Sequence, residues 1–242
     1  MLSGIGAGED LAAMGIAVAA DRPAVGENLQ DHLAYPFAVE CDLPVTAYNY
    51  VKPHYMLKAG LEYLLFRKGI MAHTALPTGG FFRTSPELEI PDMQVHVTIG
   101  MKPKSLTSLE LGTPLPMPDR HGFTAIVNQG RPLSRGRITL KSPDPAAHPS
   151  IDPRYLSDPQ DQAALFRGVL RAREILLRPE MKPYVARIDA PEGLFDSVER
   201  FMELGARDCE STYHPVGTCR MGGDAASVVD PQLRVRGVDG LR

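Results

Sequence analysis

Alternation of apolar and polar residues is the feature of this sequence that most constrains its fold. Residues 93–99 place Met, Val, Val and Ile on one side of an extended chain and Gln, His and Thr on the other. Residues 123–129 and 137–141 also alternate, and a turn region with Pro and Gly, residues 132–136, joins them. A period of two residues predicts half-buried strands, and a turn between two strands favours an antiparallel pair. We therefore expect an antiparallel sheet.

Helical spacing of apolar residues predicts elements that flank this sheet. Ser157-Asp158-Pro159 combines cap residues with a first-turn proline and begins the clearest helix, which runs to about residue 178. A second helix over residues 53–68 brings Leu57, Leu61, Leu64 and Leu65 to one face, which we expect to pack against a core, and Gly69 ends it. Shorter helices are expected at 8–14 and 194–204, and further strands at 16–19, 79–83 and 233–236. The predicted fold class is α+β (mixed α/β), an antiparallel sheet with flanking helices.

Composition narrows the class of protein. With 242 residues, 43% of them hydrophobic, the chain can form one large domain or two small ones. The 26 basic and 29 acidic residues are well mixed, which argues against a nucleic-acid partner. No apolar run is long enough for a membrane span. Three widely spaced cysteines favour a reducing compartment, so we expect a cytoplasmic location, with peripheral membrane contact left open.

The segment 211–222 contains the strongest candidate for chemistry. Pro215 biases the backbone of His214 toward extended geometry, and Gly217 supplies turn freedom beyond it. Imidazole titrates near neutral pH, so a positioned histidine can accept a substrate proton and return it. The alternative is that His214 is a turn residue or a hydrogen-bonded, partly buried ring without a catalytic role.

Five segments, in order along the chain, resemble the glucose-methanol-choline family of flavin-dependent alcohol oxidoreductases. The resemblance as a whole extends over the sequence except residues 41 to about 75, and the segments that carry it are residues 1–6, 25–32, 132–145, 151–161 and 211–242. Any one of these matches alone would be weak, but their order makes chance similarity improbable.

The resemblance implies FAD-dependent oxidation of a primary alcohol to an aldehyde, with choline or a related alcohol as the leading candidate. In this interpretation His214 is the acid/base residue, Tyr213 lies beside it at the flavin, and flavin N5 takes the hydride. The electron acceptor, oxygen or another oxidant, and the oligomeric state are left open. Choline would need an aromatic or carboxylate cage, which the sequence does not identify. The family's second catalytic His or Asn would lie beyond Arg242.

The same resemblance divides the chain by role. Residues 1–34 would be the tail of an FAD-binding domain, 35–205 a substrate-binding domain, and 206–242 the catalytic-histidine loop that returns to the FAD-binding domain. The glycine-rich motif for the FAD diphosphate is absent, so the chain resembles a fragment that would neither bind FAD tightly nor turn over alone. The alternative is a non-catalytic remnant or binding module.

Several other residues admit a structural and a functional interpretation. Asp31 and His32 are expected to fix their loop through backbone hydrogen bonds beneath the flavin, rather than to act in catalysis. His96 is expected to be solvated or hydrogen-bonded on a strand. Tyr55 and Tyr63 can reach a substrate pocket or cover the edge of a core, and the second role is commoner.

Two arginines and a cysteine suggest sites that we do not favour. Arg135 and Arg137 bracket Gly136 and are expected to lie on a solvated edge rather than to clamp an anion. Cys219 follows His214 by five residues, but two ligands make a poor zinc site. We expect Cys219 to be a small, semi-buried residue.

Overall fold

The computed structural model describes residues 1–74, 76–101 and 120–242 and divides the chain into two units. Unit 1 contains residues 1–32, 132–161 and 212–242, and unit 2 contains residues 33–131 and 162–211. Each unit is therefore built from segments that are far apart in the sequence. The predicted roles of the ranges 1–34, 35–205 and 206–242 remain a prediction.

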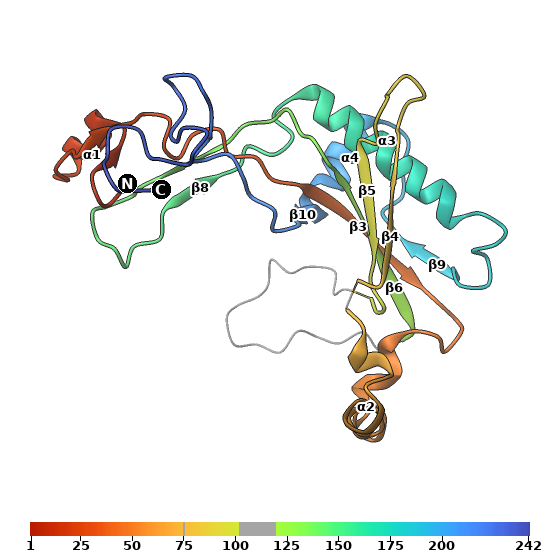
Figure 1. Ribbon diagram of the computed structural model, residues 1–242. Helices are drawn as coiled ribbons and strands as arrows, with labels where there is room; N and C mark the ends of the chain where they lie inside the picture. The colour runs from red at the N-terminus through yellow and green to blue at the C-terminus, as the bar shows by residue number, and fades with distance from the viewer. Residues whose placement is uncertain (75, 102–119) are drawn as a thin grey trace. The chain divides into compact units, whose positions relative to one another are not determined.

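An antiparallel sheet forms the centre of unit 2. Its strands lie in the order β10-β3-β6-β5-β4, with β9 also paired to β3. The four strands β3, β4, β5 and β6 run side by side in Figure 1. The strands are β3 (Leu33–Glu40), β4 (Thr78–Phe82), β5 (Met93–Val97), β6 (Gly122–Gln129), β9 (Arg187–Asp189) and β10 (Glu210–Ser211). All of their pairings are antiparallel, which confirms the predicted sheet.

The chain also forms helices and short helical turns. They are α1 (Gly8–Ala13), η1 (Ala47–Val51), α2 (Pro53–Phe66), η2 (Ile70–Ala72), α3 (Pro159–Leu176), α4 (Val198–Leu204) and η3 (Ala206–Asp208). The predicted α3 is confirmed, and the Asp158 carboxylate accepts the Gln160 N–H at 2.8 Å at its start. The helix expected from residue 194 begins later, where Ser197 caps it by accepting the Arg200 N–H at 3.2 Å. In the described parts of the chain, no helix combines the length and the apolar character that crossing a membrane requires.

Aromatic side chains make the core of unit 2. Tyr35 and Phe37 alternate along β3 and share a buried face, where their rings meet edge to face at 5.1 Å. Phe201 of α4 contacts Tyr35 at 5.5 Å and Phe166 of α3 at 5.9 Å. Burial of one such side chain contributes about 1.5–3 kcal/mol. This cluster therefore attaches both helices to one face of β3.

Strand β6 corrects one predicted pairing. We expected residues 123–129 to pair with residues 137–141, but β6 lies between β3 and β5. Both of its edges are occupied, so β7 (Arg137–Thr139) pairs instead with β8 (Ser150–Asp152) in unit 1.

Helix α2 corrects another prediction. The helix forms and ends at Arg67, whose backbone is left-handed with φ +52°. Its leucines do not pack against a core, because 49% to 69% of each is exposed: Leu57, Leu61, Leu64 and Leu65. The buried residue is Ala59. The spacing showed which residues share a face, but it could not show which face is covered.

Unit 1 begins with a parallel pair, β1 (Ile5–Gly6) and β2 (Ala20–Asp21), next to α1. The strand expected at residues 16–19 starts later, because the Ile16 N–H closes the helix on the Leu11 carbonyl at 2.9 Å.

Residues 233–236 do not form the strand that we expected there. The Asp230 carboxylate accepts the N–H groups of Gln232 and Arg234, both at 2.9 Å, and curls the chain into a turn. Only Val235 makes a bridge there, with Val229.

Candidate active site: a histidine pair in unit 1

The segment that carries His214 runs beside residues 28–32 in unit 1. Gln30 and Val216 exchange two N–H···O bonds of 2.8 Å, and on the other side of the segment Leu29 and Gly136 exchange two of 2.9 Å. The segment 28–32 is therefore held from both sides. Residues that flank it are placed by backbone hydrogen bonds rather than by flexible side chains.

A bulge interrupts this pairing at His214. The Thr212 N–H donates to the His32 carbonyl at 3.0 Å, and pairing resumes between Val216 and Gln30. Residues 213–215 thus lie opposite the single residue Asp31, which is two residues more than a regular ladder allows. Bulges re-aim side chains and are frequent near active sites. Tyr213 takes the left-handed conformation that this requires, with φ +63°.

Asp31 closes the bulge. Its carboxylate is buried and accepts the backbone N–H groups of His32 and His214, each at 2.9 Å, and the hydroxyl of Tyr155. The His214 N–H has lost its place in the ladder, so the carboxylate supplies the acceptor that a strand would otherwise give. The expected backbone hydrogen bonds of Asp31 are present.

Two imidazole rings meet at this bulge. Nδ1 of His214 lies 3.3 Å from Nδ1 of His32, with the ring centroids 5.3 Å apart and the planes at 79°. Thr212 Oγ1 lies 3.4 Å from the same His214 nitrogen and donates to the His32 carbonyl at 3.1 Å. His214 is exposed and His32 is half-buried. The ring of His32 therefore joins the candidate site, which sequence reasoning had missed.

Tyr213 and Gly217 depend on unusual backbone geometry. The side chain of Tyr213 is 75% exposed, so its ring is available beside the histidine pair. Gly217 has φ +101°, and a Cβ there would lie 2.2 Å from the carbonyl oxygen of Asn28. Only glycine fits this close approach without strain.

Ion pairs and buried polar groups fix the chain beyond the bulge. Arg220 binds both carboxylate oxygens of Asp224, at 2.7 and 2.9 Å, and the hydrogen bond from its guanidinium lowers the pKa of Asp224 to about 2. Arg236 donates to Ser227 Oγ at 3.0 Å and to the Gly222 carbonyl at 2.9 Å. These contacts close the loop from residue 220 to residue 236.

Cys219 lies on the surface, so the prediction of a semi-buried residue is wrong. The chain turns at Gly217 instead of continuing as an alternating strand, which leaves the side chain in solvent. Among the described residues, no group of three His, Cys, Asp or Glu side chains is arranged to hold a metal ion.

The guanidinium of Arg135 makes three hydrogen bonds within unit 1. It donates to the Pro132 carbonyl at 2.7 Å, the Ser134 carbonyl at 3.0 Å and Asn28 Oδ1 at 3.1 Å. Arg137 is exposed, as expected for a solvated edge. Neither arginine is arranged as an anion clamp.

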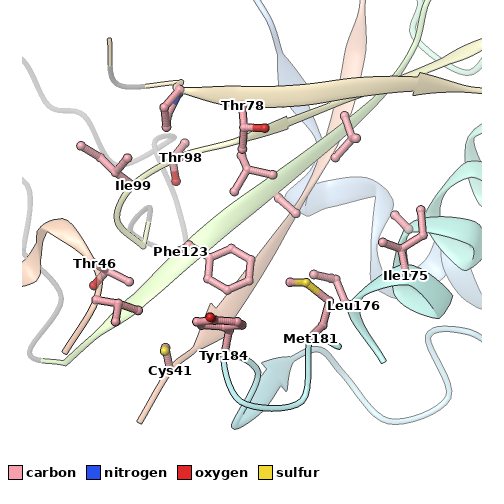
Figure 2. A pocket seen from close by; sticks show the side chains of 16 residues that line it. Cys41, Thr46, Thr78, Thr98, Ile99, Phe123, Ile175, Leu176, Met181 and Tyr184 are labelled. Carbon is pink, nitrogen blue, oxygen red and sulfur yellow. The ribbon is translucent and has the colours of Figure 1, made fainter. Parts of the chain in front are cut away.

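Unit 2 contains a cavity of about 450 Å³, shown in Figure 2. Its walls are almost wholly apolar, with Phe123 of β6 in the middle of the view and Ile175 and Leu176 of α3 at one side. Its lining includes the hydroxyl-bearing residues Thr46, Thr78, Thr98 and Tyr184, and none of the described residues that line it carries a carboxylate. Tyr55 and Tyr63 are not among the described residues that line this cavity.

Comparison with known proteins identifies a family for the C-terminal part of the chain. Residues 132–242 match the family model described as GMC oxidoreductase. Residues 132–242 thus carry a GMC oxidoreductase domain. This is the glucose-methanol-choline family that the sequence resembles, and the resemblance is confirmed. The match includes the bulge at residues 213–215 and Tyr155, whereas Asp31 and His32 precede it.

Two similar proteins match the whole chain. An oxygen-dependent choline dehydrogenase of Rhizobium etli (strain CIAT 652) is 40% identical over 248 residues, which cover 100% of this chain and 43% of the relative. An "alcohol dehydrogenase [acceptor]" of Pseudomonas putida is 38% identical over 245 residues, again 100% of this chain and 43% of the relative. The chain thus spans less than half the length of these relatives.

A solved structure agrees with the fold. Formate oxidase from Aspergillus oryzae RIB40, in a study of its FAD modification, superposes with a TM-score of 0.86 at 24% identity, covering 100% of this chain and 46% of that one. The likeness confirms the mixed architecture of an antiparallel sheet with helices.

Proposed function

We propose that these residues belong to an FAD-dependent enzyme that oxidises the CH–OH group of a primary alcohol to an aldehyde, with His214 as the acid/base residue. The observation that carries the proposal is the exposed His214 ring, held in a bulge by Asp31 and hydrogen-bonded to a second histidine. Because the chain spans 43% of its curated relatives, the activity is proposed for a polypeptide that holds a flavin together with these residues.

Alcohol oxidation needs two acceptors, one for the hydroxyl proton and one for the hydride. His214 is suited to the first role, because a neutral imidazole accepts a proton near neutral pH. FAD, when bound, supplies the hydride acceptor. Removal of the hydroxyl proton makes the carbon a better hydride donor, so a fixed base beside the alcohol speeds the reaction.

The exposed residues fit one end of FAD. Tyr213 offers an exposed aromatic ring and His214 an exposed imidazole, which suit the edge of a flat, uncharged ring system. The sequence has no Gly-x-Gly-x-x-Gly turn for the diphosphate, and α1 is only 6 residues long. We therefore propose that Tyr213 and His214 adjoin the flavin ring and leave the diphosphate to other residues.

The substrate proposal is a small primary alcohol, and choline is the first to test. The relatives are named choline dehydrogenase and alcohol dehydrogenase, which supports this class. The electron acceptor stays open between oxygen and another oxidant. We propose a cytoplasmic location and leave peripheral contact with a membrane open.

Flavin bleaching tests the proposal. In the flavin-loaded enzyme, anaerobic addition of choline or another primary alcohol is expected to bleach the flavin absorbance. His214→Ala is expected to slow bleaching about 10²–10⁴-fold, the usual effect of losing a general base. His148→Ala, at another exposed histidine of unit 1, is the matched control and is expected to bleach normally. Normal bleaching by His214→Ala would exclude His214 as the base.

A further inference from the structure

The hydrogen bonds around His214 determine which of its ring nitrogens carries the proton. We propose that Thr212 and His32 are positioning residues that hold His214 as the Nδ1–H tautomer and leave Nε2 as the basic nitrogen. The tautomer follows from the contacts alone, whereas its catalytic meaning rests on the proposed function.

Thr212 fixes the direction of one hydrogen bond. A hydroxyl has one proton, and Thr212 Oγ1 donates it to the His32 carbonyl at 3.1 Å, since a carbonyl can only accept. Toward His214 Nδ1, at 3.4 Å, the same oxygen is left with a lone pair. The proton between Thr212 and His214 must therefore come from the imidazole, on Nδ1.

His32 provides a second acceptor for the same proton. Its Nδ1 lies 3.3 Å from His214 Nδ1, and of two facing imidazole nitrogens one must donate and the other accept. If His214 donates from Nδ1, His32 accepts there and keeps its own proton on Nε2. One N–H shared by two acceptors is a common three-centre arrangement.

The backbone keeps the ring within reach of both acceptors. Asp31 binds the N–H of His214, and Thr212 is paired to the His32 carbonyl through its own N–H at 3.0 Å. Tyr155 donates its hydroxyl to Asp31 from a third segment. Rotation of the His214 ring would break the contacts to Thr212 and His32 at once.

Nitrogen NMR tests the tautomer directly. In ¹⁵N-histidine protein without flavin or alcohol, at about pH 8.5, above the ordinary pKa of imidazole of about 6.5, most side chains of this type are neutral. The His214 signals, assigned by their loss in His214→Gln, are expected to show the Nδ1–H form. Exposed His148 serves as an internal reference. A wild-type His214 with its proton on Nε2 would overturn the proposal.

Paired substitutions separate positioning from folding. Thr212→Val combined with His32→Phe removes both acceptors at similar volume and is expected to shift His214 toward the Nε2–H form. Thr212→Ser keeps the hydroxyl and is expected to keep the wild-type tautomer. Amide signals that match those of the wild-type protein away from the two substituted positions show that the variant has folded. If the double variant folds and His214 keeps Nδ1–H, Thr212 and His32 are not the cause and the proposal fails.

Kinetics links the tautomer to the proposed function. In the flavin-loaded enzyme, the double variant is expected to lose about tenfold or more in kcat, with a smaller change in KM, because the base is affected more than alcohol binding. A wild-type protein with the expected tautomer and no alcohol oxidation would contradict the proposed function while supporting this assignment.

Discussion

At the scale of single residues, the candidate site depends on atoms that close the bulge rather than on those that would react. The Asp31 carboxylate accepts three donors from three segments, and Gly217 lets the chain pass close to Asn28. Both residues act on the backbone of the segment that carries His214.

Gly217→Ala tests this dependence. The new Cβ would lie 2.2 Å from the Asn28 carbonyl oxygen, at φ +101°, so we expect a loss of about 1–3 kcal/mol in the free energy of unfolding. Gly223→Ala is the matched control, because a Cβ there meets no heavy atom within 4 Å, and its effect is expected to stay within about 0.5 kcal/mol. Urea unfolding measures both. Equal effects would show that the close approach at Gly217 does not matter.

Sequence reasoning found His214 and Tyr213 as candidates, but not Thr212, Tyr155 or the ring of His32. Contacts across a bulge depend on the register of two segments 180 residues apart, which no local pattern encodes. One signal was present: Pro215 has no N–H and suits a position without a ladder hydrogen bond.

At the scale of elements, helical spacing predicted α2 and α3 equally well, although only α3 is buried as expected. Leu165 of α3 is 1% exposed, whereas Leu61 of α2 is 49% exposed. In α3, Gly168 lets Met93 of β5 approach so closely that a Cβ would lie 2.1 Å from its methyl group. Alternation likewise predicted β5 and β6, but it could not predict that β6 pairs with β3 and β5. Local patterns therefore give elements, and contacts between distant segments decide their partners.

Alanine substitutions in the two helices should differ in cost. Leu165→Ala leaves a cavity in unit 2 and is expected to lower the free energy of unfolding by about 2–5 kcal/mol. Leu61→Ala removes an exposed side chain with the same change in volume, and about 0.5 kcal/mol or less is expected. Thermal or urea unfolding of the two variants provides the comparison. A large effect of Leu61→Ala would mean that its face is covered.

At the scale of the whole molecule, ion pairs in both units respond to acid in the same direction. In unit 2, the hydrogen bond from Arg187 lowers the pKa of Glu40, with a further contribution from Arg120. In unit 1, the Arg220 guanidinium lowers the pKa of Asp224 to about 2. A carboxyl whose pKa is lower in the folded protein stabilises it above the unfolded pKa, about 3.9 for Asp, and loses that effect as pH falls through the folded value.

Acid titration checks this sign. The free energy of unfolding is expected to fall as pH decreases from about 4 to about 2, partly because Asp224 takes up its proton over that range. The Asn side chain in Asp224→Asn cannot titrate. The free energy of unfolding of this variant should therefore depend less steeply on pH between about pH 4 and pH 2, and its pH dependence near neutral pH should be unchanged. The slope can be followed by urea unfolding at a series of pH values. An identical slope in the variant would show that Asp224 does not contribute to the loss of stability in acid.

The bulge makes chain length, as well as residue identity, a property of the site. Three residues oppose Asp31, with paired residues on either side of them. Loss or gain of one residue between Thr212 and Val216 would carry His214 away from Asp31, or turn its side chain to the other face. A substitution in this loop alters one contact at a time, but a change in its length moves every residue of the bulge relative to Asp31. The number of residues between Thr212 and Val216 is therefore as much a part of the site as the identity of His214.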